Sequence, residues 1–381
     1  MTARPHPALS AALDGCTVVL AVDRRSSELA AALERHGALV RHAPALTIVP
    51  HTDDEALVAA TRRLIARPPH IVVATTGVGF RGWMEAADEA GMLEELHRVL
   101  SAARIVARGP KARGAIQQAG LAADWVAESE TSAELGDYLL AGGIAGRRVA
   151  VQHHGSGADG LDELFARAGA EVVSLTVYRW GPPPDPAKVA RGVSATARGE
   201  VDAVLFTSAP GAAEWRAAAD RAGVLERIVT LSRSGRLLMA AVGPITAGPL
   251  VDAGLAPLIA ERGRLGSLVR SVVTHFGGGH APSLRTAAGR LELRSAGAVL
   301  DRRFIPLSRT SVAVLGELFA AQGGVVPRGR LRAVLPRSGE SAHAVEMAIA
   351  RVREAVGAPA IIRTVVKRGY RLELVEEEAR P

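Results

Sequence analysis

Short apolar runs alternate with amphipathic stretches through the first 276 residues. The runs are VVLAV, IVVATT and IVA in the first half of this region and VAVQ, AVLFTS and MAAVG in the second. Each is followed by a Gly, Ser or Thr turn and then by a stretch with helical spacing. Continuous apolar runs of this length are typical of strands buried on both faces, and their alternation with helices indicates a parallel sheet. The pattern predicts an α/β fold with two parallel-sheet lobes.

The two halves of this region also repeat each other. The segment at 17–40 is similar in sequence to 148–172. The segments 69–80 and 201–212 are similar in the same way, as are 104–127 and 237–260. Gly109 and Gly243, each followed by Pro, lie 134 positions apart. Such self-similarity indicates a duplicated module. Because ligands of open α/β sheets lie beyond the carboxyl ends of the strands, we expect the binding surface at the turns, in a cleft between the lobes.

The remaining quarter of the chain has a different pattern. Two alternating segments with a turn at 295–297 predict a small sheet, and three helices follow. The helices are expected within 308–324, 327–336 and 341–357, and a β-hairpin within 360–372. The third helix carries Val345, Ile349, Val352 and Val356 on one face. Three helices followed by a hairpin predict a winged helix-turn-helix domain.

Charge separates the two regions. Residues 285–381 hold 17 Lys and Arg against 10 Asp and Glu, whereas residues 1–284 hold 29 of each. The whole net charge of +7 therefore belongs to the C-terminal quarter, where a polyanion would bind. Lys367 and Arg368, at the tip of the hairpin, are candidate contacts, although charged hairpin tips are often simply solvated.

Composition excludes several classes of protein. The single cysteine, Cys16, cannot form an intrachain disulfide, and no Cys/His cluster has the spacing of zinc ligands. His153 and His154 precede a glycine turn, and we predict no metal site there. Gly, Pro and Asp interrupt every apolar stretch before the ~20 residues of a membrane span. We expect a cytoplasmic protein without a cofactor.

The ordered turns of the α/β region resemble those of the uroporphyrinogen-III synthase (HemD) family. The resemblance rests on Thr75–Gly77 and Thr207–Ala209 after their strands, on the two Gly-Pro turns, and on VYRWGPP at 177–183. It implies two lobes joined by a pair of crossover strands. The expected boundaries are 14–276 for the whole domain, 14–45 with 180–275 for lobe one, 47–175 for lobe two, 277–288 for a flexible linker and 289–376 for the C-terminal domain.

Members of that family close the linear tetrapyrrole hydroxymethylbilane into a ring while inverting its last pyrrole, without cofactor or metal. The resemblance implies a catalytic role for Tyr178, which would donate a hydrogen bond to the leaving hydroxyl; packing at the hinge is the alternative. It also implies contacts to substrate carboxylates, for which the alternative is helix capping or plain solvation. The candidate ligand-binding residues are Thr76, Ser208, Thr246, Lys111 and Arg24.

Three turns depart from the family's pattern. The first Thr-type turn lacks its Asn, and the first Gly-Pro turn reads Gly109-Pro110-Lys111-Ala112 and lacks the usual Thr hydroxyl. The strand at 149–152 runs into Gln152-His153-His154-Gly155. These departures lie in the turns rather than in the apolar runs. They favour a sensor over a working synthase.

The C-terminal region resembles the OmpR/PhoB class of DNA-binding domains over roughly 290–375. The segments that carry the resemblance are LSRTSVAVLGELFAAQGGVVPRGRLRAVLP, AVEMAIARVREAVG and IIRTVVKRGYRLEL. In winged domains the third helix enters the major groove and the wing contacts the backbone or the minor groove. The resemblance implies the DNA-binding residues His343, Ala344, Met347, Ala350, Arg351, Arg363, Lys367 and Arg368. Ala348 and Glu354 stand where the class usually has basic residues, so a second copy or another transcription factor is an expected partner.

Three functions follow as hypotheses. The first is a transcription regulator whose HemD-like domain senses a tetrapyrrole or another small anionic ligand. The second is a uroporphyrinogen-III synthase with a DNA-binding tail, and the third is an assembly scaffold. We favour the first, with double-stranded DNA as partner and no membrane. The fused architecture also resembles actinobacterial regulators of nitrate and nitrite assimilation, which implies control of those genes.

Overall fold

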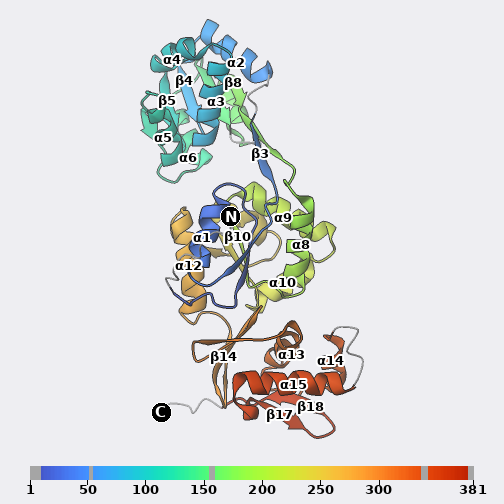
Figure 1. Cartoon of the computed structure of the whole chain (residues 1–381). Coiled ribbons are helices and arrows are strands. Elements are labelled where there is room, and N and C mark those ends of the chain that lie inside the picture. Colours follow the sequence, from blue (N-terminus) through green and yellow to red (C-terminus); the bar gives the residue numbers. More distant parts are fainter. Residues whose placement is uncertain (1–9, 51–54, 154–158, 336–341, 376–381) are drawn as a thin grey trace, which may run out of the picture. The chain divides into compact units, whose positions relative to one another are not determined.

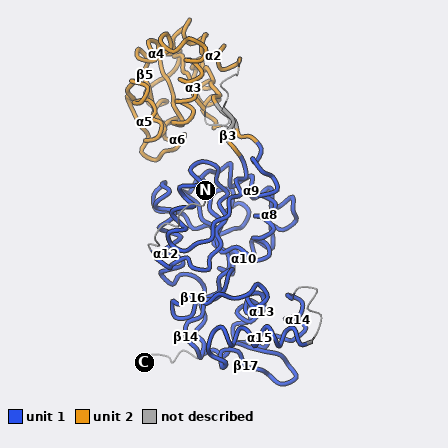
Figure 2. The backbone as a smooth tube through the Cα atoms, viewed as in Figure 1, with its two compact units in different colours: residues 1–46, 182–381 blue, residues 47–181 orange. Residues whose placement is uncertain are grey.

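The structure is a computed structural model that describes residues 10–50, 55–153, 159–335 and 342–375 (Figure 1). The chain divides into two compact units (Figure 2). One comprises residues 1–46 with 182–381, and the other comprises residues 47–181. The first unit contains lobe one and the C-terminal domain, and the second unit is lobe two.

Lobe one is built on a parallel sheet of five strands. Their order is β12 (Leu258–Ile259), β11 (Leu238–Ala241), β10 (Ala203–Phe206), β1 (Thr17–Leu20) and β2 (Leu39–His42). Val18 and Leu20 belong to one core cluster, whereas Val19 belongs to the cluster on the opposite face. Because successive side chains of a strand point to opposite faces, a strand covered on both sides needs an unbroken apolar run.

Helices cover both faces of this sheet (Figure 1). The first face packs against α1 (Ser26–Glu34) and α12 (Leu265–Gly277). The other packs against α8 (Pro186–Ala197), α9 (Ala209–Arg221), α10 (Leu225–Arg233) and α11 (Pro244–Val251). The predicted doubly covered parallel sheet is therefore confirmed for lobe one.

Lobe two repeats this design. Its parallel sheet has the order β6 (Trp125–Val126), β5 (Arg104–Ala107), β4 (Ile71–Ala74), β7 (Arg148–His153) and β8 (Glu171–Thr176). One face packs against α2 (Glu55–Ala66), α3 (Gly77–Glu89), α4 (Leu93–Ser101) and α5 (Pro110–Gln118). The other packs against α6 (Ser132–Ala141) and α7 (Leu161–Arg167).

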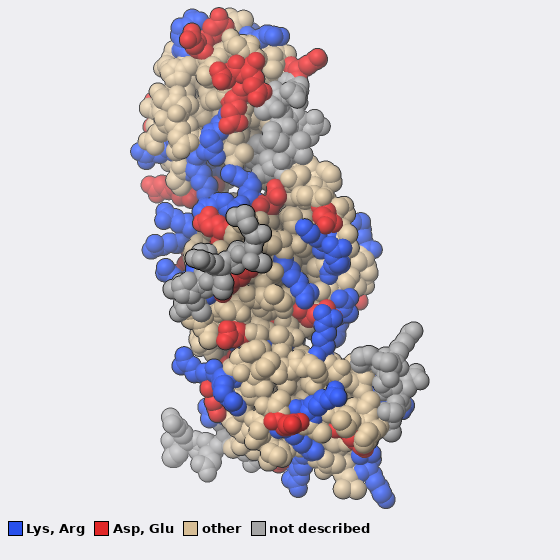
Figure 3. Space-filling model, in the orientation of Figure 1, with Lys and Arg blue, Asp and Glu red and all other residues tan. Residues whose placement is uncertain are grey.

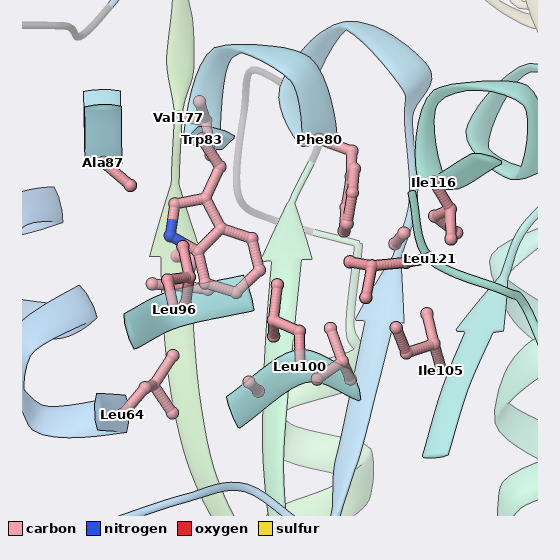
Figure 4. Close-up of a cluster of buried hydrophobic side chains, with 14 of the residues drawn as sticks. Leu64, Phe80, Trp83, Ala87, Leu96, Leu100, Ile105, Ile116, Leu121 and Val177 are labelled. Carbon is pink, nitrogen blue, oxygen red and sulfur yellow. The ribbon is translucent and has the colours of Figure 1, made fainter. Parts of the chain in front are cut away.

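The duplication extends into the two cores. Trp83 of α3 and Trp215 of α9 are both fully buried, and each follows its strand at the same distance along its helix. Figure 4 shows Trp83 and Phe80 among the leucines of the core of lobe two. Phe80 meets Trp83 edge to face, and Phe206 meets Trp215 in the same way. Apart from these aromatic pairs, the residues of both cores are largely aliphatic or Ala.

An antiparallel pair of strands stands at the boundary of lobe two. β3 (Thr47–Pro50) pairs with β9 (Tyr178–Gly181), with Thr47 opposite Gly181 and Pro50 opposite Tyr178. This is the pair of crossover strands that the family resemblance implied.

The C-terminal domain combines a sheet, three helices and a hairpin. An antiparallel sheet contains β13 (Ser283–Thr286), β14 (Gly289–Arg294), β15 (Gly297–Leu300) and β16 (Arg303–Pro306). The helices are α13 (Arg309–Ala320), α14 (Arg328–Ala333) and α15 (Ala342–Val356), followed by the 3-10 turn η2 (Pro359–Ile361) and the hairpin of β17 (Ile362–Val365) and β18 (Gly369–Leu372). One core cluster contains buried residues of all of these elements except β13, whose Leu284 packs against it. The winged helix-turn-helix prediction is confirmed.

The expected flexible linker is mostly ordered structure. α12 continues to Gly277, and β13 pairs along its whole length with β14. Only residues 278–282 lie between these two elements. The prediction of a linker over 277–288 is therefore wrong in its second half, because the pairing of Leu284 with Leu291 across the sheet outweighs the turn-forming composition.

Candidate functional site

Helix α15 has one buried face and one exposed face. Val345, Ala348, Ile349 and Val352 lie in the domain core, each with at most 2% of its surface exposed. The opposite face exposes five of the predicted DNA-binding positions. They are His343, Met347, Ala350 and Arg351, which are exposed, and Ala344, which is half-buried. The short side chains of Ala344 and Ala350 allow the helix to approach a groove closely, and His343 and Arg351 can reach the bases or the backbone from the same face.

Ala348 does not lie on the exposed face of α15. Its side chain is only 2% exposed and packs in the core, so a basic residue at this position would not reach DNA. Of the two positions where basic residues were expected, only Glu354 is exposed. Glu354 remains an acidic side chain on the exposed surface of the helix.

The wing is a hairpin with three loop residues, Val366, Lys367 and Arg368, between β17 and β18. All three are exposed, and the Lys367 and Arg368 side chains make no hydrogen bond or ion pair within the described part of the chain. Lys367 adopts a left-handed backbone with φ 62°. The two cations are thus presented side by side on a fixed turn, where they are available to a phosphate backbone.

The base of the wing is held by main-chain bonds. The Tyr370 amide donates to the Val326 carbonyl at 3.1 Å, and the Val326 amide donates to the Tyr370 carbonyl at 2.8 Å. Gly369 lies so close to this contact that a Cβ atom would stand 2.0 Å from the Val326 carbonyl oxygen. Its φ of 140° is also one that other residues rarely adopt. The loop is therefore anchored at the buried end of the hairpin.

Several basic side chains near this face already make hydrogen bonds or ion pairs within the protein. Arg353 donates to the Ile362 carbonyl at 2.6 Å and to the Thr364 hydroxyl at 3.1 Å, so it ties α15 to β17. Arg363 pairs with Glu373 at 3.5 Å, and His343 pairs with Glu346 at 3.3 Å. Exposed pairs of this kind contribute about 0–1 kcal/mol, so Arg363 can exchange its partner for a phosphate at little cost. Arg351 makes no such pair among the described residues.

Figure 3 shows the charged side chains on one face of the molecule. Blue side chains project from the edge of the C-terminal domain where Figure 1 places β17 and β18. No acidic side chain of the described residues lies within the three-residue wing loop. The loop of the wing therefore carries two positive charges and no negative charge.

The predicted ligand residues of lobe one gather at one edge of its sheet. Arg24, Ser208 and Thr246 follow β1, β10 and β11, which are neighbours in the sheet. Arg24 is exposed, Ser208 is half-buried and Thr246 is 6% exposed. The Ser208 hydroxyl caps α9, since it accepts a hydrogen bond from the Gly211 amide at 3.2 Å. The edge therefore offers two helix amino termini, of α9 and α11, beside a cation.

Lobe two presents the matching pair Thr76 and Lys111, which follow the neighbouring strands β4 and β5. The Thr76 hydroxyl caps α3 by accepting from the Gly79 amide at 3.1 Å. Lys111 is exposed at the start of α5. The two loops touch, since a Cβ on Gly77 would stand 2.3 Å from the Lys111 carbonyl oxygen. Tyr178 begins β9, and the position of its side chain lies outside the described part of the chain.

Comparisons with known proteins identify both regions. Residues 27–270 match the family model described as uroporphyrinogen-III synthase HemD. The chain belongs to the HemD family. Residues 301–372 match the model of the C-terminal domain of transcriptional regulatory proteins. The protein therefore joins a HemD domain to a DNA-binding domain of the OmpR/PhoB type.

Individual relatives are of the same two kinds. A mutant uroporphyrinogen III synthase from the extremely thermophilic bacterium Thermus thermophilus is 30% identical, with a TM-score of 0.55 over 68% of this chain and 97% of that one. The uncharacterized protein YjjA of Bacillus subtilis is 26% identical over 69% of this chain and 96% of its own length. The DNA-binding domain of the response regulator AdeR, solved with an intercistronic region, is 18% identical over 22% of this chain and 95% of that one, with a TM-score of 0.21.

One of the three turns of the HemD domain that depart from the family's pattern contains a buried charge cluster. His153 is fully buried at the end of β7, with Nε2 2.9 Å from Asp162 Oδ1 and Nδ1 3.2 Å from Asp159 Oδ1. Burial lowers the pKa of His153, but the bonds and charges of the two carboxylates outweigh it and raise the pKa to about 9. The imidazolium thus fixes the start of α7 against β7. His154 lies outside the described residues.

Gln152 supports the neighbouring turn. Its side chain is fully buried, and Oε1 accepts from the Thr76 amide at 3.3 Å. The Thr75 hydroxyl donates to the Gln152 carbonyl at 2.8 Å. Gln152 and His153 are therefore structural residues of lobe two. No group of three or more His, Cys, Asp or Glu side chains in the described ranges is arranged to hold a metal ion.

Two further features escaped the sequence analysis. Val366, at the tip of the wing, is 79% exposed, although an apolar residue directly after the four residues of β17 reads as part of the strand. The carboxylates of Asp159 and Asp162 lie six and nine positions beyond His153, and only the fold brings them to its ring. Among the described helices, none is long and apolar enough to cross a bilayer.

Proposed function

We propose that this protein is a transcription regulator that binds double-stranded DNA through α15 and the wing, with the HemD domain as its sensor. The single observation that carries the proposal is the wing loop, where Lys367 and Arg368 are exposed without partners among the described residues. The match to a regulatory DNA-binding domain supports it. In this proposal Arg351 and His343 contact base edges, and Lys367, Arg368 and Arg363 contact phosphates.

The proposed ligand of the sensor is a tetrapyrrole carboxylate or a smaller organic anion. Ser208 and Thr246 stand at helix amino termini, where partial positive charge favours anions, and Arg24 adds a full charge in lobe one. Thr76 and Lys111 form the corresponding set in lobe two. Tyr178 is proposed to contact the same ligand.

The test is selection of DNA by the full-length protein. We would incubate it with fragmented genomic DNA of its source, recover the bound fragments and footprint those that are enriched. We expect a recurrent sequence protected by the wild type and lost in the double variant Arg351→Ala with Arg368→Ala. Arg62→Ala, which removes an exposed cation of lobe two, is the matched control and should select the same sequence. Recovery of random fragments alone would refute the regulator.

A working synthase is the second candidate, because the family match and the Ser208 and Thr246 turns are features of the enzyme domain. Here Tyr178 would donate to the leaving hydroxyl of hydroxymethylbilane, and the lobes would fix the chain for ring closure. The assay supplies hydroxymethylbilane and measures the ratio of type III to type I uroporphyrinogen. Excess type III isomer that disappears in Tyr178→Phe supports the enzyme, whereas the spontaneous type I product alone excludes it.

The genes of nitrate and nitrite assimilation are our proposed targets. This rests on the fused architecture, which resembles that of actinobacterial regulators of those genes. Sequencing of the DNA bound in cells grown on nitrate is the direct test. Enrichment upstream of nitrate or nitrite reductase genes supports the assignment, and enrichment only elsewhere contradicts it.

A further inference from the structure

The turn between β14 and β15 binds the edge of the lobe-one sheet that is opposite the ligand loops. Ser295 and Ala296 form this turn. The Ser295 amide lies 2.8 and 3.1 Å from the two carboxylate oxygens of Asp202, and the Ala296 amide donates to the Gly15 carbonyl at 3.1 Å. The Ser295 hydroxyl donates to the Thr17 hydroxyl at 2.9 Å. Lobe one therefore satisfies every hydrogen-bond donor of the turn.

Asp202 is the centre of this contact. It is 1% exposed and also accepts from the Thr17 amide at 2.8 Å and from Arg236 at 2.9 Å. A buried carboxylate is tolerated only when it is paired and hydrogen-bonded. Ser295 supplies part of that compensation from the DNA-binding domain.

The backbone conformation of the turn also indicates that the turn is held by its contact with lobe one. Two-residue hairpin loops favour turn types with positive φ at one or both residues. The next hairpin follows this rule, with φ 46° at Asp301 and 69° at Arg302. Neither Ser295 nor Ala296 has a positive φ. The β14–β15 turn thus takes a shape that is less favourable by itself and that presents both amides to lobe one.

Side-chain packing surrounds these bonds. The Arg294 guanidinium is buried, lies 4.6 Å from the centre of the Phe276 ring and donates to the Phe276 carbonyl at 3.2 Å. A Cβ on Gly15 would stand 2.0 Å from the Phe304 ring, so β16 rests directly on the chain before β1. Phe276 belongs to α12 and Phe304 to the DNA-binding domain. The contact therefore includes a desolvated core besides its polar centre.

Three strands connect this contact to the ligand loops. Thr17 opens β1, Asp202 immediately precedes β10, and Arg236 lies just before β11. Each strand is four residues long, which is about 13 Å, and is buried along its length. The loop residues at the opposite ends of these strands are Arg24, Ser208 and Thr246.

We propose that the Asp202–Ser295 contact is a rigid coupling element between sensor and reader. It holds lobe one and the winged-helix domain as one body, and it transmits rearrangement of the ligand loops through β1, β10 and β11 to the DNA-binding domain. The second statement rests on the proposed function, whereas the first does not. Transmission requires that the ligand bind the two arrangements of the loops with different affinity.

The substitution Ser295→Pro tests the coupling, because it removes the contact to lobe one and leaves the hairpin able to fold. Proline is favoured at the first central position of a type I turn, so the hairpin can still form, but both the amide and the hydroxyl that reach lobe one are removed. Ser295→Ala is the matched control, because it keeps the hydrogen bond from the backbone amide of residue 295 to the Asp202 carboxylate. An unchanged far-ultraviolet circular dichroism spectrum and melting profile show that each variant remains folded.

Spin labels on the full chain measure rigidity. The exposed residues Arg221 and Arg332 are replaced by Cys for labelling, and Cys16 is buried. We expect one narrow distance distribution for the wild type and for Ser295→Ala, and a distribution at least twofold wider for Ser295→Pro. Equal widths in the wild type and Ser295→Pro would overturn the coupling element, whatever the protein does with DNA.

Uroporphyrin III is the probe for transmission. With the genomic fragment selected above, we expect it to change the DNA affinity of the wild type at least threefold and that of Ser295→Pro less than 1.5-fold. Equal responses in both proteins would refute transmission through this contact. A narrow wild-type distribution with no response to uroporphyrin III would contradict the proposed sensor and transmission, while rigid docking would stand.

Discussion

At the scale of single residues, the wing tip depends on one backbone position. Gly369 combines φ 140° with a contact that leaves no room for a side chain. We expect Gly369→Ala to lower the free energy of unfolding of the C-terminal domain by about 1–3 kcal/mol or more. Gly329→Ala is the control, because nothing lies near its Cβ position in α14 and alanine favours helix by about 0.5–1 kcal/mol. Chemical denaturation measures both, and equal effects would contradict the account.

Two arginines should differ in their effect on DNA. Arg368, on the wing, is expected to contact phosphate, so Arg368→Ala should weaken binding to all sequences by a similar factor. Arg351, on α15, is expected to contact a base, so Arg351→Ala should change the preference at one position by about 1–3 kcal/mol. Affinities for a panel of single-base variants of the operator test this. The assignment fails if Arg351→Ala weakens every sequence equally.

Some residue roles could be predicted from sequence, and others could not. The exposure of Lys367 and Arg368 follows from the hairpin pattern itself. By contrast, the inward direction of Ala348 depends on the rotation of α15 against α13, which a small apolar residue does not reveal. Val366 was missed because an exposed valine and a strand valine look the same in a sequence.

At the scale of elements, the helix caps show how one side chain serves structure and ligand. Ser208 caps α9, and its hydroxyl is also a candidate ligand contact. Aspartate caps as well as serine does, so Ser208→Asp should keep the melting temperature within about 2 °C of the wild type. Its negative charge should weaken uroporphyrin III binding more than tenfold, as measured by fluorescence titration. Unchanged ligand affinity would place the anion elsewhere.

The β7–α7 connection predicts a pH dependence of stability. The folded pKa of His153 is about 9, above the ordinary value of 6.5, so its stabilisation is complete below pH 6.5 and is lost as the pH rises through about 9. The loss amounts to roughly 3 kcal/mol. His153→Gln should lower the melting temperature of lobe two at pH 6.5 and remove this part of its decline up to pH 9.5. Calorimetry that shows the same pH slope in both proteins would contradict the ion-pair cluster.

Element types were largely predictable because both sheets are buried on each face. That environment selects uninterrupted apolar runs such as VVLAV, and the pattern then marks the strand directly. β13 was missed for the opposite reason. It is a short strand next to HFGGGHAPS, and only its pairing with β14 makes it a strand.

At the scale of the whole molecule, the family resemblances and the duplication predicted the order of domains, but not how they are joined. The Gly-rich stretch at 277–279 suggested independent domains. In the structure, Asp202 and Ser295, 93 positions apart, form a buried contact within one compact unit. Such contacts leave no periodic signal, because a buried Asp before a strand and a Ser in a turn are each common alone.

The central claim is that the cationic wing of the C-terminal winged-helix domain binds the DNA backbone. The most direct test is the dependence of DNA affinity on salt for the full-length protein, since each neutralised phosphate contributes a slope of about 0.9 in log K against log salt. We predict that Lys367→Ala with Arg368→Ala reduces this slope by about 2, and that Arg62→Ala leaves it unchanged. A wild-type affinity that is indifferent to salt, or equal slopes in all three proteins, would contradict the account.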